Sequence, residues 1–211
     1  MLDIAFITQP EKLPAIKART EELEFNMASE DRTGALLQVL AASKPGGELL
    51  ELGTGTGIGT SWLLSGMDET ATLVSVETDE SLQSVAREIL GADTRLSLVL
   101  EDGAEFLQKK PKQSFDLVFA DAMPGKFESL DDALAVVKPG GFYIIDDLLP
   151  QPNWPDGHSE KVDSLMYRLS ADPRFAVLPI IWASGVAVLT RLARSKEAEA
   201  SDQRRYDIQG R

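Results

Sequence analysis

The fold of this chain is decided by the stretch Glu51-Leu52-Gly53-Thr54-Gly55-Thr56-Gly57-Ile58-Gly59, which directly follows the apolar pair Leu49-Leu50. An apolar strand that ends in alternating glycines must turn tightly and expose bare backbone, because glycine has no Cβ to block a ligand. Residues 60–64 are predicted to form a helix, whose first N–H groups would point at that ligand. The stretch therefore predicts a strand–turn–helix unit with a ligand-binding turn.

The spacing of these glycines argues against a dinucleotide. The G-x-G-x-x-G fingerprint needs a third glycine, but Ile58 or Thr60 stands there, depending on whether the count begins at Gly53 or Gly55. An NAD-linked oxidoreductase is therefore the weaker alternative, which preferential binding of NADH would support. The pattern present, acidic-x-Gly-x-Gly-x-Gly, resembles the first motif of class I S-adenosyl-L-methionine (SAM) dependent methyltransferases, whose glycine turn meets the amino acid end of SAM. The resemblance implies SAM-binding residues at Glu51, Gly53, Thr54, Gly55 and Gly57.

Composition narrows the class of protein. The chain has 211 residues, which suits one α/β domain, although two small domains remain open. The net charge of −13 argues against a nucleic acid partner, because phosphate binding needs a surplus of Lys and Arg. There is no cysteine, which excludes disulfides, thiolate metal sites and a cysteine nucleophile. Without a basic leader or a long apolar stretch, we expect a cytoplasmic protein with no membrane partner.

Short apolar strands alternate with amphipathic helices after residue 44. Residues 10–43 read as two helices, with Ser29 as the N-cap of the second. The predicted strands are 48–52, 72–77, 96–100, 115–120 and 141–146. The predicted helices between them are 57–66, 80–91, 103–109 and 127–137, followed by a helix from 157 to about 171. Such alternation is typical of βαβ units and a parallel sheet covered on both faces.

The C-terminal part predicts how the sheet ends. Residues 175–182 and 186–192 are separated only by Ala183-Ser184-Gly185, which favours an antiparallel hairpin. The predicted fold is therefore a doubly wound, Rossmann-like α/β sheet of seven strands, mostly parallel, with helices on both faces. We divide the chain into an N-terminal helical segment (1–44) that caps the pocket, a SAM-dependent methyltransferase domain (45–193) and a charged tail (194–211).

Ligands of open α/β sheets bind at the carboxyl ends of the strands, so the residues that end each strand are the candidates. Glu77, followed by Thr78, ends the second strand, where a carboxylate can accept both ribose hydroxyls of a nucleoside. Asp102 follows the third strand and precedes Gly103-Ala104, where it can accept from an adenine amino group. Asp102 also suits an ordinary helix N-cap, and the two roles are compatible.

Three carboxylates follow the fourth and fifth strands. Asp121 ends the fourth strand, and Asp146 and Asp147 end the fifth. Carboxylates that crowd together repel one another, so such a cluster requires a cation or a shared proton. A set of oxygen ligands suits Mg²⁺, Mn²⁺ or Ca²⁺ rather than zinc or copper.

The chain from about Gly34 to Leu192 resembles the O-methyltransferase group that includes catechol and caffeoyl-CoA O-methyltransferases. In that group an Asp after the fourth strand and an Asp-Asn pair after the fifth hold Mg²⁺, which binds both oxygens of a vicinal diol. The resemblance implies that the metal ligands are Asp121, Asp146 and Asp147, although Asp147 stands where the family has Asn. The family base is a Lys three residues after the first Asp, where this chain has Pro124. Lys126, two positions later, is the candidate base. A solvated lysine without a catalytic role is an equally good interpretation of this residue.

The segment 148–158 contains three prolines and is predicted to lie over the mouth of the site. Trp154 could form a wall for a planar substrate, and His158, the single histidine, could act as a base near neutral pH. A structural role for His158 at a helix start is the alternative. Trp62 and Trp182 are interpreted as packing residues.

These observations predict a SAM-dependent methyltransferase that transfers a methyl group to an oxygen of a small molecule, assisted by a divalent metal. The predicted catalytic residues are Asp121, Lys126 and His158, with Asp121 also near SAM. A metal-independent methyltransferase acting on nitrogen or a carboxylate, and a non-catalytic SAM-binding protein, are the alternatives. The effect of a metal chelator on turnover distinguishes a metal-independent methyltransferase from the metal-assisted enzyme. The methyl acceptor stays unidentified, and both a monomer and a homodimer remain open.

Overall fold

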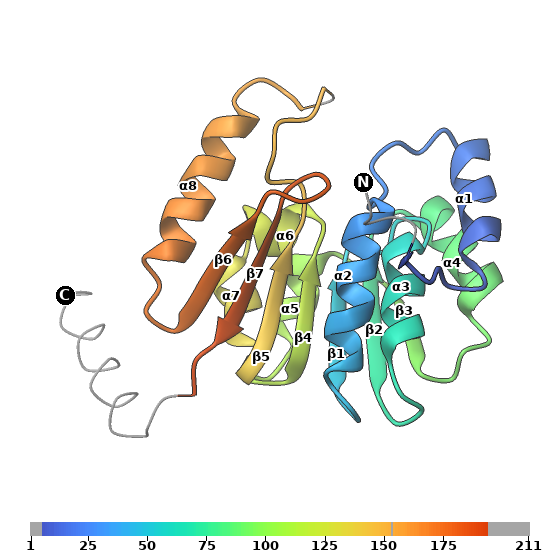
Figure 1. Cartoon of the computed structure of the whole chain (residues 1–211), viewed down its shortest axis with the longest axis horizontal. Coiled ribbons are helices and arrows are strands. Elements are labelled where there is room, and N and C mark those ends of the chain that lie inside the picture. Colours follow the sequence, from blue (N-terminus) through green and yellow to red (C-terminus); the bar gives the residue numbers. More distant parts are fainter. Residues whose placement is uncertain (1–5, 153, 194–211) are drawn as a thin grey trace.

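The computed structural model describes residues 6–152 and 154–193 as a seven-stranded sheet with helices on both faces (Figure 1). The strand order is β3-β2-β1-β4-β5-β7-β6. Strands β1 to β5 run parallel, β7 is antiparallel to β5, and β6 is antiparallel to β7. The predicted fold class, including the C-terminal antiparallel hairpin, is confirmed.

The elements follow one another in an alternating order. The strands are β1 (Glu48–Leu52), β2 (Thr72–Glu77), β3 (Leu96–Leu100), β4 (Phe115–Ala120), β5 (Val137–Ile145), β6 (Phe175–Ile180) and β7 (Val186–Arg191). The helices are α1 (Leu13–Glu22), α2 (Asp31–Ala42), α3 (Ile58–Gly66), α4 (Glu80–Leu90), α5 (Gly103–Gln108), α6 (Met123–Lys126), α7 (Leu130–Ala135) and α8 (His158–Ser170).

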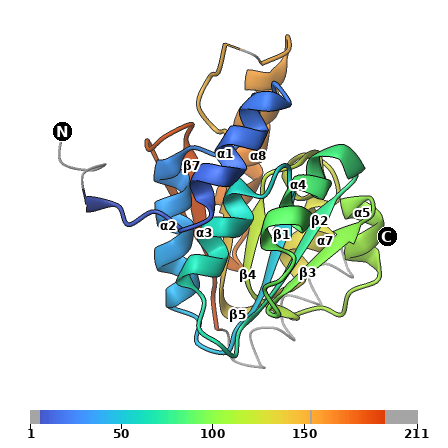
Figure 2. The same cartoon turned by 90° about the vertical axis from the view of Figure 1, so that its right-hand side faces the viewer.

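Two apolar cores lie on opposite faces of the sheet. On one face Trp62 of α3 and Leu37 of α2 pack on strand residues such as Leu117, and α1 adds its buried residues to the same core. On the other face Phe106 of α5 and Leu169 of α8 belong to a second core, together with α7. Figure 2 shows α2 and α3 on one side of the sheet and α5 and α7 on the other. Burial on both faces explains the nearly continuous apolar strands.

The register of the central strands brings their carboxyl ends to one edge. Leu52 of β1 pairs with Ala120 of β4, which pairs with Ile145 of β5. Leu52 also pairs with Val76 of β2. The residues that follow these four positions, which include the glycine turn and the acidic cluster, therefore meet at the same edge of the sheet.

Three sequence predictions about element ends are wrong. Helix α2 begins at Asp31 with Glu30 as its N-cap, because the hydroxyl of Ser29 donates to Asp121 across the site instead. The helix predicted at 127–137 is shorter, because residues 123–126 form a turn with non-helical backbone at their centre and α7 covers only Leu130–Ala135. Strand β5 begins at Val137, which pairs with Phe115 before a register shift, and not at residue 141 as predicted.

In the ranges given above, no helix has both the length and the apolar character needed to cross a lipid bilayer. The charged tail predicted at 194–211 lies outside the described residues.

Candidate functional site

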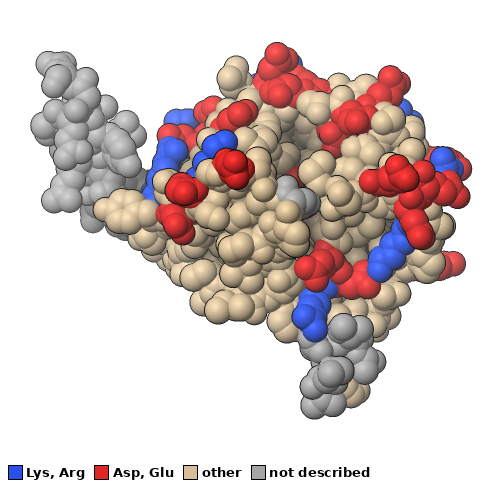
Figure 3. Space-filling model, turned by 90° about the horizontal axis from the view of Figure 1, so that it is seen from above, with Lys and Arg blue, Asp and Glu red and all other residues tan. Residues whose placement is uncertain are grey.

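A cavity of about 500 Å³ lies at the carboxyl ends of the parallel strands. Seen from above, this face is hollowed near its centre and carries more acidic than basic side chains (Figure 3). The glycine turn, the loop before α2, the ends of β2, β4 and β5, and the start of α8 all contribute to its wall. The lining residues include Phe25, Ser29, Gly53, Thr54, Gly55, Glu77, Leu82, Asp121, Met123, Lys126, Phe127, Asp147, Gln151, Trp154, His158 and Ser184.

The glycine turn forms the floor of one half of this cavity. Gly53, Gly55 and Gly57 have φ angles of 99°, 50° and 98°, which side-chain-bearing residues rarely adopt. A Cβ added at Gly53 would lie 2.6 Å from the carbonyl oxygen of Asp121. The turn therefore requires glycine for its backbone conformation, as the sequence predicted, and Gly53 is also required by its close approach to the residue that follows β4.

Glu77 links the turn to the end of β2. Its carboxylate accepts hydrogen bonds from the backbone N–H of Gly55 at 2.8 Å, of Thr78 at 2.8 Å and of Asp79 at 3.0 Å. These N–H donors fix the carboxylate at the cavity wall, beside Leu82 of α4. A carboxylate held in this way keeps further lone pairs for hydroxyl donors of a ligand.

Several residues predicted to bind SAM are not among the residues that line this cavity. Asp102 caps α5 by accepting hydrogen bonds from the N–H groups of Ala104 and Glu105, which confirms the helix-cap interpretation. Gly57 is the N-cap of α3. The predicted SAM-binding residues outside the lining are Glu51, Gly57, Thr78, Asp102, Gly103 and Ala104, and the predicted metal ligand Asp146 also lies outside it.

Glu51 is fully buried beneath the glycine turn. Its Oε2 accepts hydrogen bonds of 2.5 Å from the hydroxyls of Thr60 and Ser75, and its Oε1 has no hydrogen-bond partner within the described part of the chain. Burial raises the pKa of Glu51 to about 8, against the smaller opposing effect of the two hydroxyls. The carboxyl therefore joins β1, β2 and α3 beneath the turn.

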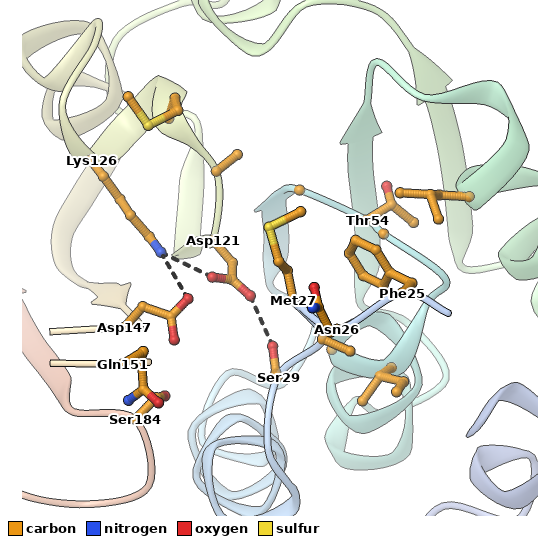
Figure 4. Close-up of a pocket in the computed structure, with 18 of the residues that line it drawn as sticks. Phe25, Asn26, Met27, Ser29, Thr54, Asp121, Lys126, Asp147, Gln151 and Ser184 are labelled. Atoms are coloured by element: carbon orange, nitrogen blue, oxygen red, sulfur yellow. Dashed lines mark hydrogen bonds and ion pairs between the residues drawn. The ribbon is translucent and has the colours of Figure 1, made fainter. Parts of the chain in front are cut away.

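Asp121 and Lys126 form an ion pair in the other half of the cavity. Lys126 Nζ donates to Asp121 Oδ1 at 3.0 Å, and the hydroxyl of Ser29 donates to Asp121 Oδ2 at 2.9 Å. Lys126 Nζ also lies 3.8 Å from Asp147 Oδ2. Figure 4 shows the lysine pointing between the two aspartates, with Gln151 and Ser184 beside Asp147. The structure thus brings Asp121, Asp147 and Lys126 together, as the sequence predicted.

The charge state of this group follows from its burial and its partners. Burial by itself lowers the pKa of Lys126, but the carboxylates of Asp121 and Asp147 outweigh it and raise that pKa above its usual range. Burial raises the pKa of Asp147, and the lysine opposes that rise. Lys126 is therefore a cation at neutral pH, which is unsuited to accepting a proton in its resting state.

Asp146 does not line the cavity and is bound by hydroxyl groups of other segments. It is 1% exposed, and its Oδ1 accepts hydrogen bonds from Ser184 Oγ at 2.6 Å, from Thr33 Oγ1 at 3.4 Å and from the N–H of Asp147 at 2.9 Å. Burial, and after it the charge of Asp121, raises its pKa to about 7. Asp146 therefore ties the β6–β7 turn and α2 to the end of β5.

An aromatic group closes the cavity on the side of α8. The ring of His158 lies 4.5 Å from that of Trp154 and 5.2 Å, edge-on, from that of Phe127, measured between centroids. Burial lowers the pKa of His158, and the positive charges of Lys126 and Lys161 lower it further. His158 is therefore neutral at pH 7 and able to accept a proton. Trp62 is fully buried, as predicted for a packing residue.

The sequence predicted that the segment 1–44 caps the pocket, but it identified no individual lining residue in the loop before α2. Phe25, Met27 and Ser29 line the cavity although no motif singles them out. The glycine at position 55 is the sequence feature that relates to this loop, because a Cβ at Gly55 would lie 3.2 Å from the ring of Phe25. Ser184 and Leu82 were missed for a similar reason, because each reaches the cavity only through packing of the tertiary structure.

Comparison with known proteins agrees with this geometry. A methyltransferase domain family matches residues 50–148. A protein of Mycobacteroides abscessus named "Putative O-methyltransferase" is 29% identical over 75% of this chain and 78% of its own length. A protein of Mycolicibacterium vanbaalenii with the same name is 32% identical over 53% of this chain and 52% of its own. The second match thus spans about half of that relative.

Solved structures extend the likeness of fold over most of the chain. The O-methyltransferase TomG of Streptomyces achromogenes, solved in complex with SAM, superposes with a TM-score of 0.76 and 21% identity, covering 91% of this chain and 96% of its own. By sequence over residues 50–148 and by fold over most of its length, the chain is therefore similar to SAM-dependent O-methyltransferases.

Proposed function

We propose that this protein transfers a methyl group from SAM to an oxygen of a small molecule. One observation carries the proposal. A single cavity joins the glycine turn and Glu77, on one side, to Asp121, Lys126 and His158 on the other. The proposed nucleoside-binding residues and the charged and basic residues therefore line the same cavity, as group transfer between two ligands requires.

The residues around the glycine turn fit SAM. Gly53 and Gly55 line the cavity with backbone atoms, Glu77 presents a carboxylate to the ribose hydroxyls, and Leu82 offers an apolar contact. When bound, SAM supplies a methyl group on a positively charged sulfur. Asp121, at the point where the two halves of the cavity meet, suits the positive amino end of the ligand. Glu51 supports the turn from beneath through its hydrogen bonds with Thr60 and Ser75.

The other half of the cavity fits a planar acceptor. Trp154, Phe127 and Met123 provide apolar walls, and Gln151 and Ser29 provide hydrogen-bonding groups. His158 is the proposed base, because it is neutral near pH 7 and lines the cavity. Catalysis then comes mainly from holding the acceptor oxygen in line with the methyl group.

The acidic cluster, as it is folded here, does not fit a divalent metal. The Lys126 ammonium lies between Asp121 and Asp147, and Asp146 is engaged by Ser184 and Thr33. Across the described part of the chain, no group of three or more His, Asp or Glu side chains is arranged to hold a metal ion. We therefore assign no step of the reaction to a metal. The cytoplasmic location and the homodimer stay predictions.

The first test is calorimetric titration of S-adenosylhomocysteine and of NADH into the wild type and Glu77→Gln. We expect the wild type to bind the nucleoside and not NADH, and Glu77→Gln to bind it about 10- to 100-fold more weakly, since a charged hydrogen-bond acceptor is lost. Glu48→Gln, an exposed change on β1, serves as the control. Preferential binding of NADH would contradict the proposal.

Turnover is tested by transfer of labelled methyl groups from SAM to phenols, amines and carboxylic acids. Label on phenolic oxygen supports the proposal. Label on amines or carboxylates alone would instead support methylation of nitrogen or of a carboxylate. Binding of S-adenosylhomocysteine with no transfer to any of these acceptors would favour a non-catalytic SAM-binding protein.

A further inference from the structure

The cluster of carboxylates at the ends of β4 and β5 already contains a cation that belongs to the protein. The side chain of Lys126 is 8% exposed, and its ammonium lies 3.0 Å from Asp121 Oδ1 and 3.8 Å from Asp147 Oδ2. A divalent ion bound to the same two carboxylates would lie close to this ammonium and be repelled by it. The lysine and a metal therefore compete for one position.

We propose that Lys126 takes the place of a divalent cation in this protein, so that its ammonium binds the acceptor oxygen and methyl transfer needs no metal. The proposal rests on the function proposed above and narrows its substrate class. A metal chelates two neighbouring oxygens, whereas one ammonium N–H binds one oxygen. The expected acceptor is therefore a molecule with a single acidic hydroxyl, such as a phenol or an enol, and a vicinal diol is not required.

The ammonium has a donor to offer the acceptor. Of its three N–H groups, one is directed at Asp121 within hydrogen-bond distance, and the contact with Asp147 is longer. Lys126 itself lines the cavity, in which the apolar side chains of Met123 and Phe127 also lie. A cation in such partly apolar surroundings interacts strongly with a developing negative charge, because little water screens it.

A buried turn holds the lysine in position. Gly125, directly before it, has a φ angle of 90°, and a Cβ there would lie 2.8 Å from Leu52 Cδ1. The hydroxyl of Tyr143 donates to the carbonyl oxygen of Gly125 at 2.5 Å, and the Gly125 N–H donates to the carbonyl oxygen of Glu128 at 2.7 Å. The hydrogen bond from Tyr143 thus fixes the turn 123–126 to β5. The conformation of this turn explains why Lys126 still reaches Asp121, although it lies two positions later in the sequence than the corresponding lysine of the related family.

The chemical step balances without an additional reactant. The acceptor oxygen forms a bond to the methyl carbon while the carbon–sulfur bond breaks, and the electron pair of that bond stays on sulfur. The hydroxyl proton passes to His158, which lines the same cavity. Lys126 keeps its proton throughout and stabilises the negative charge on oxygen.

The position of the cation is tested by titrating Mn²⁺ into protein saturated with S-adenosylhomocysteine and counting free Mn²⁺ by electron paramagnetic resonance. The wild type is expected to take up no Mn²⁺. Lys126→Ala, which uncovers Asp121 and Asp147, is expected to gain one site, and adding Asp121→Asn is expected to remove it. Lys109→Ala, which removes an exposed lysine paired with Glu101, is the matched control and should behave as the wild type.

Two results would overturn the proposal. One is uptake of Mn²⁺ by the wild type that Asp121→Asn abolishes, since the carboxylates would then hold a metal in the presence of the lysine. The other is failure of Lys126→Ala to gain a site while it still binds S-adenosylhomocysteine. Lys126→Arg keeps the charge and should exclude Mn²⁺ as the wild type does, which guards against a merely structural effect.

The role toward the acceptor is tested with 4-nitrophenol, whose phenolate absorbs visible light. At a fixed pH, the wild type saturated with S-adenosylhomocysteine should increase the phenolate fraction of the bound probe, and Lys126→Met should not. Equal spectra for the two proteins would overturn the role of the ammonium. Failure of the wild type to bind S-adenosylhomocysteine would instead contradict the proposed function itself, so the two failures are distinguishable.

Discussion

At the scale of single residues, burial decides what each charged group can do. Glu51 and Lys126 are both buried, yet the carboxyl has only hydroxyl donors around it, whereas the ammonium lies beside two carboxylates. Burial therefore favours the neutral form of Glu51, and the ion pairs keep the charged form of Lys126. Among the described residues, His158 has no such anionic partner within ion-pair distance, and burial is the main cause of its lowered pKa.

Glu51 should make the protein less stable as the pH rises. In the folded protein its pKa is about 8, against 4.5 for an ordinary Glu, so between these values the unfolded chain loses a proton that the folded chain keeps. The free energy of unfolding then falls with rising pH by up to about 1.4 kcal/mol per pH unit from this group. Glu51→Gln should reduce this fall, measured by urea unfolding from pH 5 to pH 8.

The control for this measurement is Glu48→Gln on the same strand, where the carboxylate is exposed and the pH dependence should match the wild type. An unchanged pH dependence in Glu51→Gln would mean that Glu51 is charged in the folded protein.

His158 should act as a base down to slightly acidic pH. Because its pKa lies below 6.5, it remains neutral above that pH, and kcat/KM should stay level there and fall only at lower pH. His158→Asn should lower kcat/KM by about 100-fold and remove this fall, since general base catalysis is lost. The measurement is a pH–rate profile with the acceptor found by methyl transfer.

Lys161→Ala offers a matched variant for the same profile. It removes one of the charges that lower the pKa of His158, so the fall in kcat/KM should move to higher pH. A profile that is identical in His158→Asn and the wild type would show that another group accepts the proton.

At the scale of secondary-structure elements, the site depends on how closely neighbouring elements approach. Helices α2 and α3 contact each other through glycines, since a Cβ at Gly34 would lie 2.2 Å from Trp62 Cδ1 and one at Gly66 would lie 2.1 Å from the carbonyl oxygen of Gln38. This approach fixes α2 against α3, and with it the loop before α2 that lines the cavity.

Gly34→Ala should therefore destabilise the fold. The added methyl group must displace the fully buried indole of Trp62, and overpacking of this kind costs about 1–3 kcal/mol. Chemical denaturation measures the loss. Val39→Ala on the exposed side of α2, where the side chain is 65% exposed, should change stability by less than about 0.5 kcal/mol. Equal stability of Gly34→Ala and the wild type would contradict the close approach.

At the scale of the whole molecule, segments distant in sequence form one cavity. Ser29 contacts Asp121 through a hydrogen bond of 2.9 Å, and the β6–β7 turn supports the loop after β5 through hydrogen bonds from the N–H of Leu148 at 3.0 Å and of Leu149 at 2.8 Å. A ligand in the cavity would therefore contact the N-terminal, central and C-terminal parts of the domain at once.

Binding of S-adenosylhomocysteine should accordingly slow hydrogen exchange in the loop 24–30 and in the glycine turn together. At a ligand concentration of about 100 times the dissociation constant, it should also stabilise the fold by about 2.7 kcal/mol through mass action. Amide exchange followed by mass spectrometry and thermal unfolding measure these effects. The strand β6 at the far edge of the sheet is the internal control for locally restricted protection. Protection of the glycine turn without the loop would mean that the loop does not cover the nucleoside.

The sequence by itself determined the sheet and half of the site. Alternating glycines after an apolar strand, acidic residues at strand ends and a hairpin-like gap at 183–185 are local signals, and they predicted the fold, the positions of Gly53 and Glu77, and the meeting of Asp121 with Asp147. Strand ends are predictable in this way because parallel strands in register deliver their next residues to one edge.

Only the tertiary structure decided which groups face one another within that edge. It turned Asp146 toward Ser184 and Thr33, placed Ser29 beside Asp121 instead of at a helix cap, and brought Lys126 between two carboxylates. These orientations depend on hydrogen bonds between segments far apart in the chain and on a left-handed turn at Gly125. Local sequence cannot determine them, because a side chain's direction is set by the neighbours that packing supplies.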